Sequence, residues 1–349
     1  MIEVFSTAED QKWDEIVCSM SNFDVYYLSG YVKAFEKNGD GKACLVYIHD
    51  NNARLIHVIM KRDISDMEEF DGLFKEDEYY DVVTPYGYGG MLIEGRDASG
   101  LFSEYIDFCI ANNIVCEFDR FNPVSNNADK VKEFYEIKEL GNTVYIDTSS
   151  QETIWQNMSS KNRNMIRKAW KSGMQVYWGR APWMLDSFME IYNQTMDRDN
   201  ADEYYYFNKD FYESILYDLK QQAMWFYAVA EEKIIAMSIF LFTNGRMHYH
   251  LSGSLTDYRS MAPTNLILYE AAMWACEQGY ECLHLGGGVG ASCDSLYRFK
   301  KAFNRGDDML FCIGRKIYLP DMYDKLVQLR SESDENFQLN VNFFPQYRG

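Results

Sequence analysis

The sequence predicts an α/β protein built from two similar mixed domains. Three observations lead to this prediction: strand-like and helix-like segments alternate along the 349 residues, 47% of the residues are hydrophobic, and one order of elements occurs twice. That order is a hairpin, a strand, a helix and a further strand. A chain of this size and apolar content can bury a large core and commonly divides into about two domains.

The first half opens on a predicted hairpin. Residues 42–50 and 53–63 are rich in β-branched and aromatic residues, and they flank Asn51 and Asn52, a dipeptide typical of a tight turn. After the hairpin we expect a strand at 81–94, a helix at 99–113, a buried strand at 113–121, a short helix at 127–137 and a strand at 143–148. These elements describe a mixed α/β domain.

A domain boundary is expected after residue 148, which gives domains 1–148 and 149–349. Ser149 and Glu152 have the spacing of a capping box, and Gly173 ends the helix that they begin. Beyond it we expect helices at 182–197 and 209–221, strands at 224–231, 233–242 and 246–254, a helix at 263–278 and a strand at 281–286. The element order of the first half therefore recurs, and we infer a structural duplication from that order alone.

Composition and charge narrow the classes of partner. The chain has 34 Lys and Arg against 53 Asp and Glu, a formal net charge of -19, so its mean field repels phosphate backbones and DNA is not an expected partner. The eight cysteines form no Cys-x-x-Cys pair, and the acidic N-terminal segment is unlike a signal peptide, which together predict a cytoplasmic protein with reduced thiols. The sequence has no run of about 18 apolar residues, so no membrane span is predicted.

Glycines and histidines near the end of the second half suggest a site. Residues 286–290 (GGGVG) follow a strand but match neither nucleotide-binding glycine motif, so a flexible loop beside a cleft is favoured over a phosphate loop. His248 and His250 share a predicted strand, and His284 lies on a later one. Because no carboxylate or cysteine accompanies them at ligand spacing, we expect hydrogen-bonded histidines in a cleft wall and no metal site.

A dense basic segment lies at 159–173, in a chain that is otherwise acidic. Its cations are Lys161, Arg163, Arg167, Lys168 and Lys171. Two interpretations stay open: a solvated helix face, or a face that receives a phosphorylated substrate, since Arg and Lys pair strongly with phosphate oxygens.

A second helix carries lysines directly after the glycine loop. Phe299 and Phe303 lie four residues apart on one face of this predicted helix, whereas Lys300 points away from that face. Packing explains the aromatic residues. The glycines upstream would leave room for a ligand where the lysine-bearing helix begins.

These segments together resemble the FemAB-like branch of the GNAT acyltransferase superfamily. The resemblance rests on TPYGYGG (84–90), FDRFNP (118–123), the basic segment, and HLGGG followed by DSLYRFKKAF (284–303). It implies two tandem GNAT-like domains, each a mixed, mostly antiparallel sheet flanked by helices, around a central cleft. It also implies transfer of an aminoacyl or acyl group to an amine of a peptidoglycan or polysaccharide precursor.

The resemblance also implies roles for individual residues. Lys300 matches the lysine of the family's Phe-Lys motif and is expected to stabilise charge on the oxyanion or leaving group. Tyr249 and Asp294 are expected to orient the amine or the motif, and Phe299 to pack against the donor. The acceptor side would be lined by Tyr86, Tyr88, Arg120 and Arg163. The structural alternatives are packed rings, hydrogen bonds and ion pairs.

The donor-binding turn departs from the family pattern. The acetyl-CoA signature has a degenerate counterpart in RSMAPT, with Arg259, Ala262 and Thr264 at the matching positions, and Pro263 lacks a backbone N–H for a pyrophosphate. Acyl-CoA and aminoacyl-tRNA therefore both remain candidate donor substrates, with no tightly bound cofactor. The acceptor is expected to be a small-molecule or nucleotide-linked cell-envelope precursor. The alternatives are a CoA-dependent N-acetyltransferase acting on an amino sugar or small amine, and a non-catalytic binding module.

Overall fold

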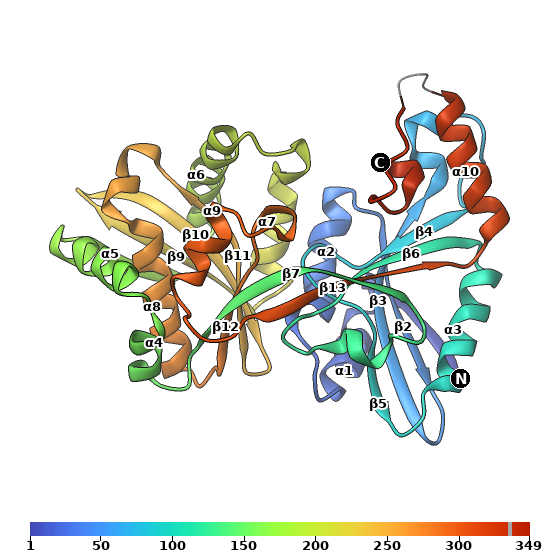
Figure 1. Cartoon of the computed structure of the whole chain (residues 1–349), viewed down its shortest axis with the longest axis horizontal. Coiled ribbons are helices and arrows are strands. Elements are labelled where there is room, and N and C mark those ends of the chain that lie inside the picture. Colours follow the sequence, from blue (N-terminus) through green and yellow to red (C-terminus); the bar gives the residue numbers. More distant parts are fainter. Residues whose placement is uncertain (334–336) are drawn as a thin grey trace. The chain divides into compact units, whose positions relative to one another are not determined.

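The computed structural model describes residues 1–333 and 337–349, which form two compact units (Figure 1). Unit 1 contains Met1–Leu140 and Phe311–Gly349, and unit 2 contains Gly141–Leu310. This division differs from the predicted domains, which assign all of 149–349 to the second half. The reason is strand β13 (Met309–Ile317), which pairs antiparallel with β6 (Ile114–Arg120) and so brings the end of the chain into unit 1.

Unit 1 is a sheet with helices packed against it. Its other strands are β1 (Ile2–Ser6), β2 (Lys42–His49), β3 (Ala53–Asp63), β4 (Tyr80–Val83) and β5 (Leu92–Gly95), and its helices are α1 (Asp10–Ser19), α2 (Ser29–Asn38), α3 (Ser99–Ala111) and α10 (Pro320–Ser333). The strand order is β1-β2-β3-β4-β6-β13, with β5 paired to β3. Neighbours are antiparallel except β4 and β6, which are parallel.

Unit 2 has the same plan. Strand β7 (Glu136–Asp147) enters it from unit 1 and pairs with β12; the unit's own strands are β8 (Gln175–Gly179), β9 (Ala223–Ala230), β10 (Lys233–Thr243), β11 (Arg246–Ser254) and β12 (Cys282–Gly286). Its helices are α4 (Gln151–Asn157), α5 (Ser160–Lys171), α6 (Trp183–Asp199), α7 (Lys209–Tyr217), α8 (Pro263–Glu277) and α9 (Ser295–Lys301). The strand order is β7-β12-β11-β10-β9-β8, and only β11 and β12 are parallel.

The predicted duplication is confirmed by these pairings. In each unit an antiparallel meander ends in a strand whose parallel partner lies after a helix: β4 and β6 are separated by α3, and β11 and β12 by α8. The helix spans the distance that a parallel connection requires. The mixed α/β class with mostly antiparallel sheets is therefore confirmed as well.

Several predicted elements have different bounds. The strand expected at 81–94 is two strands, β4 and β5, because Gly87 and Gly90 adopt positive φ between them and break the extended chain. The helix expected at 127–137 is only a 3-10 turn at Asn127–Lys130, after which β7 begins.

The helix expected to follow the boundary is interrupted. Ser150, and not Ser149, caps α4 by accepting a hydrogen bond from the Thr153 backbone N–H at 3.0 Å. Ser159 then caps a separate helix, α5, by accepting from the Asn162 N–H at 3.2 Å. Strands β1, β8 and β13 and helices α1, α2 and α10 were not predicted from the sequence.

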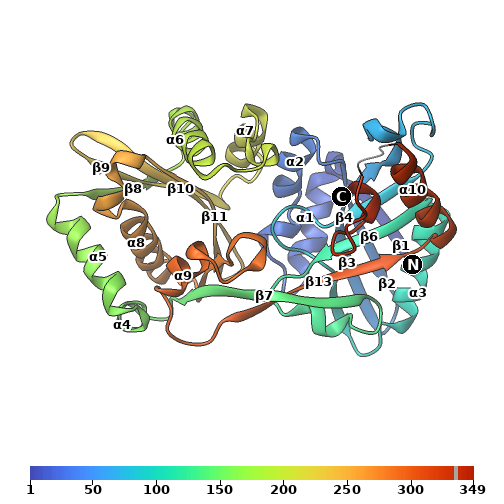
Figure 2. The ribbon, with the colours of Figure 1, turned by 45° about the horizontal axis from the view of Figure 1, so that its top comes forward.

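The core of unit 2 lies between its sheet and α8. Phe226, Ala228 and Phe240 of the sheet pack there with Leu266 and Ala271 of α8. Helix α6 covers the opposite face, as Figure 2 shows. Among the described residues, no helix is long and apolar enough to cross a membrane.

Unit 1 contains a polar centre within its apolar core, between the sheet and α3. His57 on β3 and Glu117 and Asp119 on β6 are fully buried. Glu117 accepts hydrogen bonds from His57 and from three tyrosine hydroxyls, those of Tyr105, Tyr135 and Tyr318. Four donors compensate the buried Glu117 carboxylate for its lost hydration.

Charge in this centre is shared unevenly between the two carboxyl groups. Burial raises the pKa of Asp119 to about 8, and the nearby Glu117 carboxylate adds to the rise. Burial by itself would lower the pKa of His57, but the charges of Asp119 and Glu117 raise it overall. At neutral pH this arrangement favours a charged His57–Glu117 pair beside a protonated Asp119.

The raised pKa of Asp119 predicts how stability depends on pH. The folded state keeps a proton that the unfolded chain loses near pH 4, so stability should fall as pH rises from about 4 to about 8. Asp119→Asn should flatten that slope, measured as melting temperature across pH, whereas Asp107→Asn at an exposed position of α3 should keep the wild-type slope. An unchanged slope in the Asp119 variant would contradict the assignment.

Candidate functional site

Strands β11 and β12 of unit 2 separate after a short parallel pairing. They pair only from Arg246↔Cys282 to His248↔His284. Past this point β11 continues along β10 and β12 along β7. The register of β11 shifts here, because Ile239 faces Leu251 while Phe240 faces Tyr249, which leaves His250 as a bulged residue. A bulge of this kind bends a strand and re-aims its side chains.

Two histidines close the paired part of these strands. His248 and His284 are buried, with ring centroids 5.6 Å apart, and the Nε2 of His284 lies 2.9 Å from the Thr143 hydroxyl. The hydrogen bond of His284 agrees with the prediction for that residue.

The described residues contain one group whose ligand atoms could hold a metal, and it is the polar centre of unit 1. The candidate ligand atoms of His57, Glu117 and Asp119 lie within 4.8 Å of one another. Both oxygens of Glu117 already accept hydrogen bonds from tyrosine hydroxyls, so this carboxylate belongs to a hydrogen-bonded network. The two carboxylate oxygens of Asp119 are buried without a hydrogen-bond partner.

Lys300 lies close to the point where the strands separate. Its side chain is only 8% exposed, and its Nζ donates a hydrogen bond of 2.7 Å to the carbonyl oxygen of Gly287, just past the end of β12. Burial lowers the pKa of Lys300 to about 8, although the Asp294 carboxylate acts in the opposite direction. A buried lysine is uncommon and titrates readily, so this amine combines a positive charge with a low-dielectric setting.

Asp294 fixes the glycine loop to the helix that carries Lys300. Its Oδ1 accepts from the Tyr297 N–H at 2.8 Å and caps α9, while its Oδ2 accepts from the Val289 N–H at 3.1 Å. A Cβ added at Gly288 would lie 2.3 Å from this carboxylate. The missing side chain at Gly288 therefore leaves room for Asp294 and for the Ser292 carbonyl, whereas a Cβ at Gly290 would meet nothing within 4 Å.

The structure brings two further predicted residues close to Lys300. The ring centroid of Tyr249 lies 6.0 Å from the Lys300 Nζ. Burial raises the pKa of Tyr249 to about 12, so its phenol stays protonated at neutral pH. Phe299 packs against the unit 2 core and meets Phe303 edge to face at 5.7 Å.

The predicted donor residues form one turn before α8. Arg259 is exposed, Ala262 is buried with a left-handed backbone (φ 62°), and Thr264 lies in the first turn of the helix. Lys168 of α5 donates a hydrogen bond of 2.6 Å to the Ser260 carbonyl in this turn. Exposed cations thus surround a helix N-terminus, where anions are favoured.

Arg163 has a structural partner that the sequence did not reveal. Its guanidinium donates to the carbonyl oxygens of Met158 at 2.5 Å and Trp155 at 3.3 Å, at the end of α4. The side chain stabilises the break between α4 and α5, because those carbonyls have no partner within the helix. Arg163 belongs to unit 2, whereas the other predicted acceptor-side residues belong to unit 1.

Tyr86, Tyr88 and Arg120 lie close together in unit 1. Tyr86 stacks on Phe35 with centroids 5.8 Å apart. Tyr88 meets Tyr26 edge to face, and Arg120 lies 5.1 Å from the Phe118 ring. The ring packing that was expected as the structural alternative to a binding role is therefore present. All three side chains are nevertheless only half-buried and still reach the surface.

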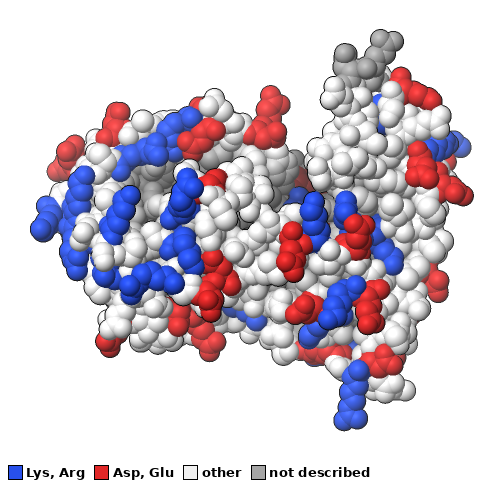
Figure 3. All heavy atoms as spheres, in the orientation of Figure 1, with Lys and Arg blue, Asp and Glu red and all other residues white. Residues whose placement is uncertain are grey.

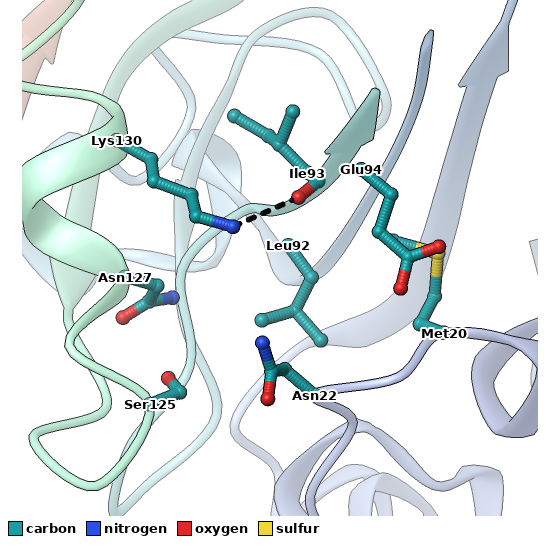
Figure 4. Close-up of a pocket in the computed structure, with 8 residues that line it drawn as sticks. All are labelled: Met20, Asn22, Leu92, Ile93, Glu94, Ser125, Asn127 and Lys130. Atoms are coloured by element: carbon teal, nitrogen blue, oxygen red, sulfur yellow. Dashed lines mark hydrogen bonds between the residues drawn. The ribbon is translucent and has the colours of Figure 1, made fainter. Parts of the chain in front are cut away.

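A shallow pocket of unit 1 involves none of the predicted residues. It is lined by Met20, Asn22, Leu92, Ile93, Glu94, Ser125, Asn127 and Lys130 (Figure 4). Lys130 donates to the Ile93 carbonyl at 3.1 Å, and Glu94 pairs with Arg54. Its charged groups already have partners, which makes it a weaker candidate than the Lys300 region.

Comparison with known proteins agrees with this geometry. Residues 158–301, which include β11, β12 and Lys300, match the family model of an acetyltransferase (GNAT) domain. The predicted resemblance to the FemAB-like branch is confirmed. The two meanders with their single parallel pairs are thus GNAT-like units.

Individual relatives share the sequence or the fold. Over 179 residues the chain is 26% identical to a UDP-N-acetylmuramoylpentapeptide-lysine N(6)-alanyltransferase of Weissella viridescens; the match covers 48% of this chain and half of that protein's length. The crystal structure of FemX superposes with a TM-score of 0.67 at 14% identity, over 93% of this chain and 99% of that one. A tandem GNAT protein from the clavulanic acid biosynthesis pathway gives a TM-score of 0.50 at 7% identity, over 90% of this chain and 98% of that one.

The double role of Asp294 can be tested by substitution. Asp294→Ala removes both the cap of α9 and the tie to the glycine loop, and should lower the free energy of unfolding by about 1 kcal/mol. Asp294→Asn keeps a capping oxygen and should recover most of that loss in denaturant unfolding. Equal stability of the alanine variant and the wild type would show that the cap contributes nothing.

Proposed function

We propose that this chain is an acyltransferase that moves an aminoacyl or acyl group onto an amine of a peptidoglycan or related cell-envelope precursor. The similarity to an enzyme named as an alanyltransferase on a lysine of a cell-wall precursor supports the reaction class. The observation that carries the proposal is the buried Lys300, placed by α9 where the parallel strands of the GNAT-like unit separate.

The proposed chemistry is aminolysis. The neutral acceptor amine attacks the carbonyl carbon of an ester or thioester, and a tetrahedral oxyanion forms. The intermediate then collapses: the C–O or C–S bond breaks, the leaving group takes up a proton, and the attacking nitrogen loses one. Negative charge develops first on the carbonyl oxygen and then on the leaving atom, and a fixed cation in a water-poor site lowers the energy of both stages.

Lys300 is the proposed catalytic cation. The Gly287 carbonyl holds its Nζ, and the scarcity of water around it strengthens its field. Tyr249 is proposed to donate a hydrogen bond, since a phenol with a pKa of about 12 is a poor base at neutral pH. Asp294 acts through the position of α9 and is a positioning residue.

The remaining predicted residues complete the proposal. Arg259, Ala262 and Thr264 are proposed to receive the phosphate-bearing part of the donor at the N-terminus of α8. Tyr86, Tyr88 and Arg120 are proposed to contact the acceptor. Arg163 is left out, because its guanidinium is bound to the end of α4.

The central test is Lys300→Met, which keeps the length of the buried side chain and removes its charge. Turnover should fall by about 10²-fold or more, the scale found for a lost electrostatic donor. Lys301→Met, one residue along the same helix, should retain turnover, because the Lys301 amine pairs with Asp308 and the Gly306 carbonyl.

The pH profile distinguishes a catalytic cation from a structural one. Wild-type turnover should decline as pH rises through about 8, where Lys300 loses its proton, and Lys300→Arg should move the decline to higher pH. Full turnover in the methionine variant would remove Lys300 from the mechanism.

Donor identity can be measured by calorimetry of the full chain with CoA, acetyl-CoA and a charged tRNA pool. Micromolar binding of CoA, reduced by Arg259→Ala, would support an acyl-CoA donor at the RSMAPT turn. Binding of charged tRNA without CoA would support aminoacyl transfer. Binding of none of them would favour the non-catalytic module and contradict the proposed activity.

A further inference from the structure

The basic segment continues into an acid-free stretch that is unusual for this chain. Between Glu152 and Asp186 the sequence has no Asp or Glu, although the whole chain has a net charge of -19. Its cations are Lys161, Arg163, Arg167, Lys168, Lys171 and Arg180. The structure places this stretch from α4 through α5 and β8 to the start of α6.

The three lysines of α5 lie on its exposed face. Lys161, Lys168 and Lys171 are exposed and follow one another at spacings of seven and three residues, which puts them on one side of a helix. The buried side of α5 carries Ile166 and Ala169. Figure 3 shows Lys and Arg gathered on the face of unit 2 that carries α5.

Large aromatic side chains are exposed beside these cations. Trp170, Trp178 and Trp183 have exposed fractions of 42%, 48% and 49%. Trp170 belongs to α5, and Trp178 to β8, the last strand of the unit 2 sheet. Trp178 stacks on Phe226, which faces α8, whereas Trp183 meets Tyr227, the next residue of β9. Successive strand residues face opposite sides, so aromatic rings project from both faces of this sheet edge.

We propose that this basic-aromatic edge, formed by Lys161, Lys168, Trp170, Lys171, Trp178 and Trp183, docks unit 2 onto an anionic lipid bilayer. Trp side chains prefer the boundary between water and hydrocarbon. Each Lys or Arg held near anionic headgroups adds roughly 1 kcal/mol. Three exposed tryptophans beside lysines supply both the interfacial preference and the attraction to anionic headgroups. Neither a solvated helix face nor core packing requires this combination of residues.

The shape of the edge favours a bilayer over RNA. Single-stranded nucleic acid binds in a basic groove that follows its backbone, with aromatic rings along the groove. Here the rings stand on an edge strand and on the outer side of a helix, and they project from both sheet faces. A planar partner can meet such an edge, whereas one strand of RNA cannot contact both faces at once. The proposal is independent of the transfer reaction and of Lys300.

Sedimentation with lipid vesicles tests the proposal. The full chain should bind vesicles of phosphatidylcholine with phosphatidylglycerol, bind phosphatidylcholine alone much less, and dissociate as salt increases. Reversing Lys161, Lys168 and Lys171 to Glu should weaken binding about tenfold or more, and Trp178→Ala with Trp183→Ala should weaken it at every salt concentration. A shift of tryptophan emission to shorter wavelength on binding should be smaller in the tryptophan variant, in which only Trp170 of the three edge tryptophans remains.

Matched controls keep the test specific. Lys220→Glu and Tyr217→Ala alter exposed residues of unit 2 outside the edge and should bind as the wild type does. Circular dichroism verifies that each variant is folded. Absence of wild-type binding to anionic vesicles, equal binding by all variants, or binding to a tRNA pool without binding to vesicles would each overturn the proposal.

Discussion

The candidate site depends on a parallel pairing that is only three residue pairs long. If β11 and β12 stayed paired to their ends, the sheet of unit 2 would be continuous and α9 would have no opening to approach. The bulge at His250 shifts the register of β11 against β10, and β12 stays paired with β7 as far as Gly286. His248 and His284 lie where the strands part, and Lys300 reaches the Gly287 carbonyl just beyond. One local irregularity in the backbone thus creates the position for the buried cation.

Unit 1 shows the same topology without that opening. After β4 and β6 pair, the chain leaves the sheet at 85–88 and returns, so that Gly89 bridges to Phe121 and its N–H donates to the Arg120 carbonyl at 2.7 Å. The Tyr27 hydroxyl holds the next carbonyl, that of Gly90, at 2.8 Å. The parallel strands β11 and β12 of unit 2 therefore separate, whereas the segments that follow β4 and β6 of unit 1 remain joined by hydrogen bonds. This asymmetry is consistent with the proposed division of roles, in which Lys300 of unit 2 stabilises charge and Tyr86 and Tyr88 of unit 1 contact the acceptor.

Local sequence predicted what local interactions determine. The hairpin of β2 and β3 and helix α8 follow from periodicity and turn residues, whereas Lys300 was singled out by its match to the Phe-Lys motif of the family that the sequence resembles. The pairing of β13 with β6 joins segments nearly 200 residues apart, and no local pattern encodes it. The role of Arg163 depended on a break between α4 and α5 that the strong helical pattern concealed. The His57–Glu117–Asp119 centre joins two strands that are distant in sequence, so its residues appeared as isolated polar positions.

The free-energy cost of keeping Lys300 charged in a buried position bears on whether this residue serves function or packing. A pKa lowered from 10.5 to about 8 corresponds to a cost on the order of 3 kcal/mol for keeping Lys300 charged at neutral pH. A methionine of similar length would fill the space without that cost. The hydrogen bond to Gly287 contributes about 1.5–3 kcal/mol, a magnitude comparable to that cost. A lysine here therefore adds little to stability over a methionine, whereas the proposed stabilisation of a developing negative charge uses the charge that a methionine lacks.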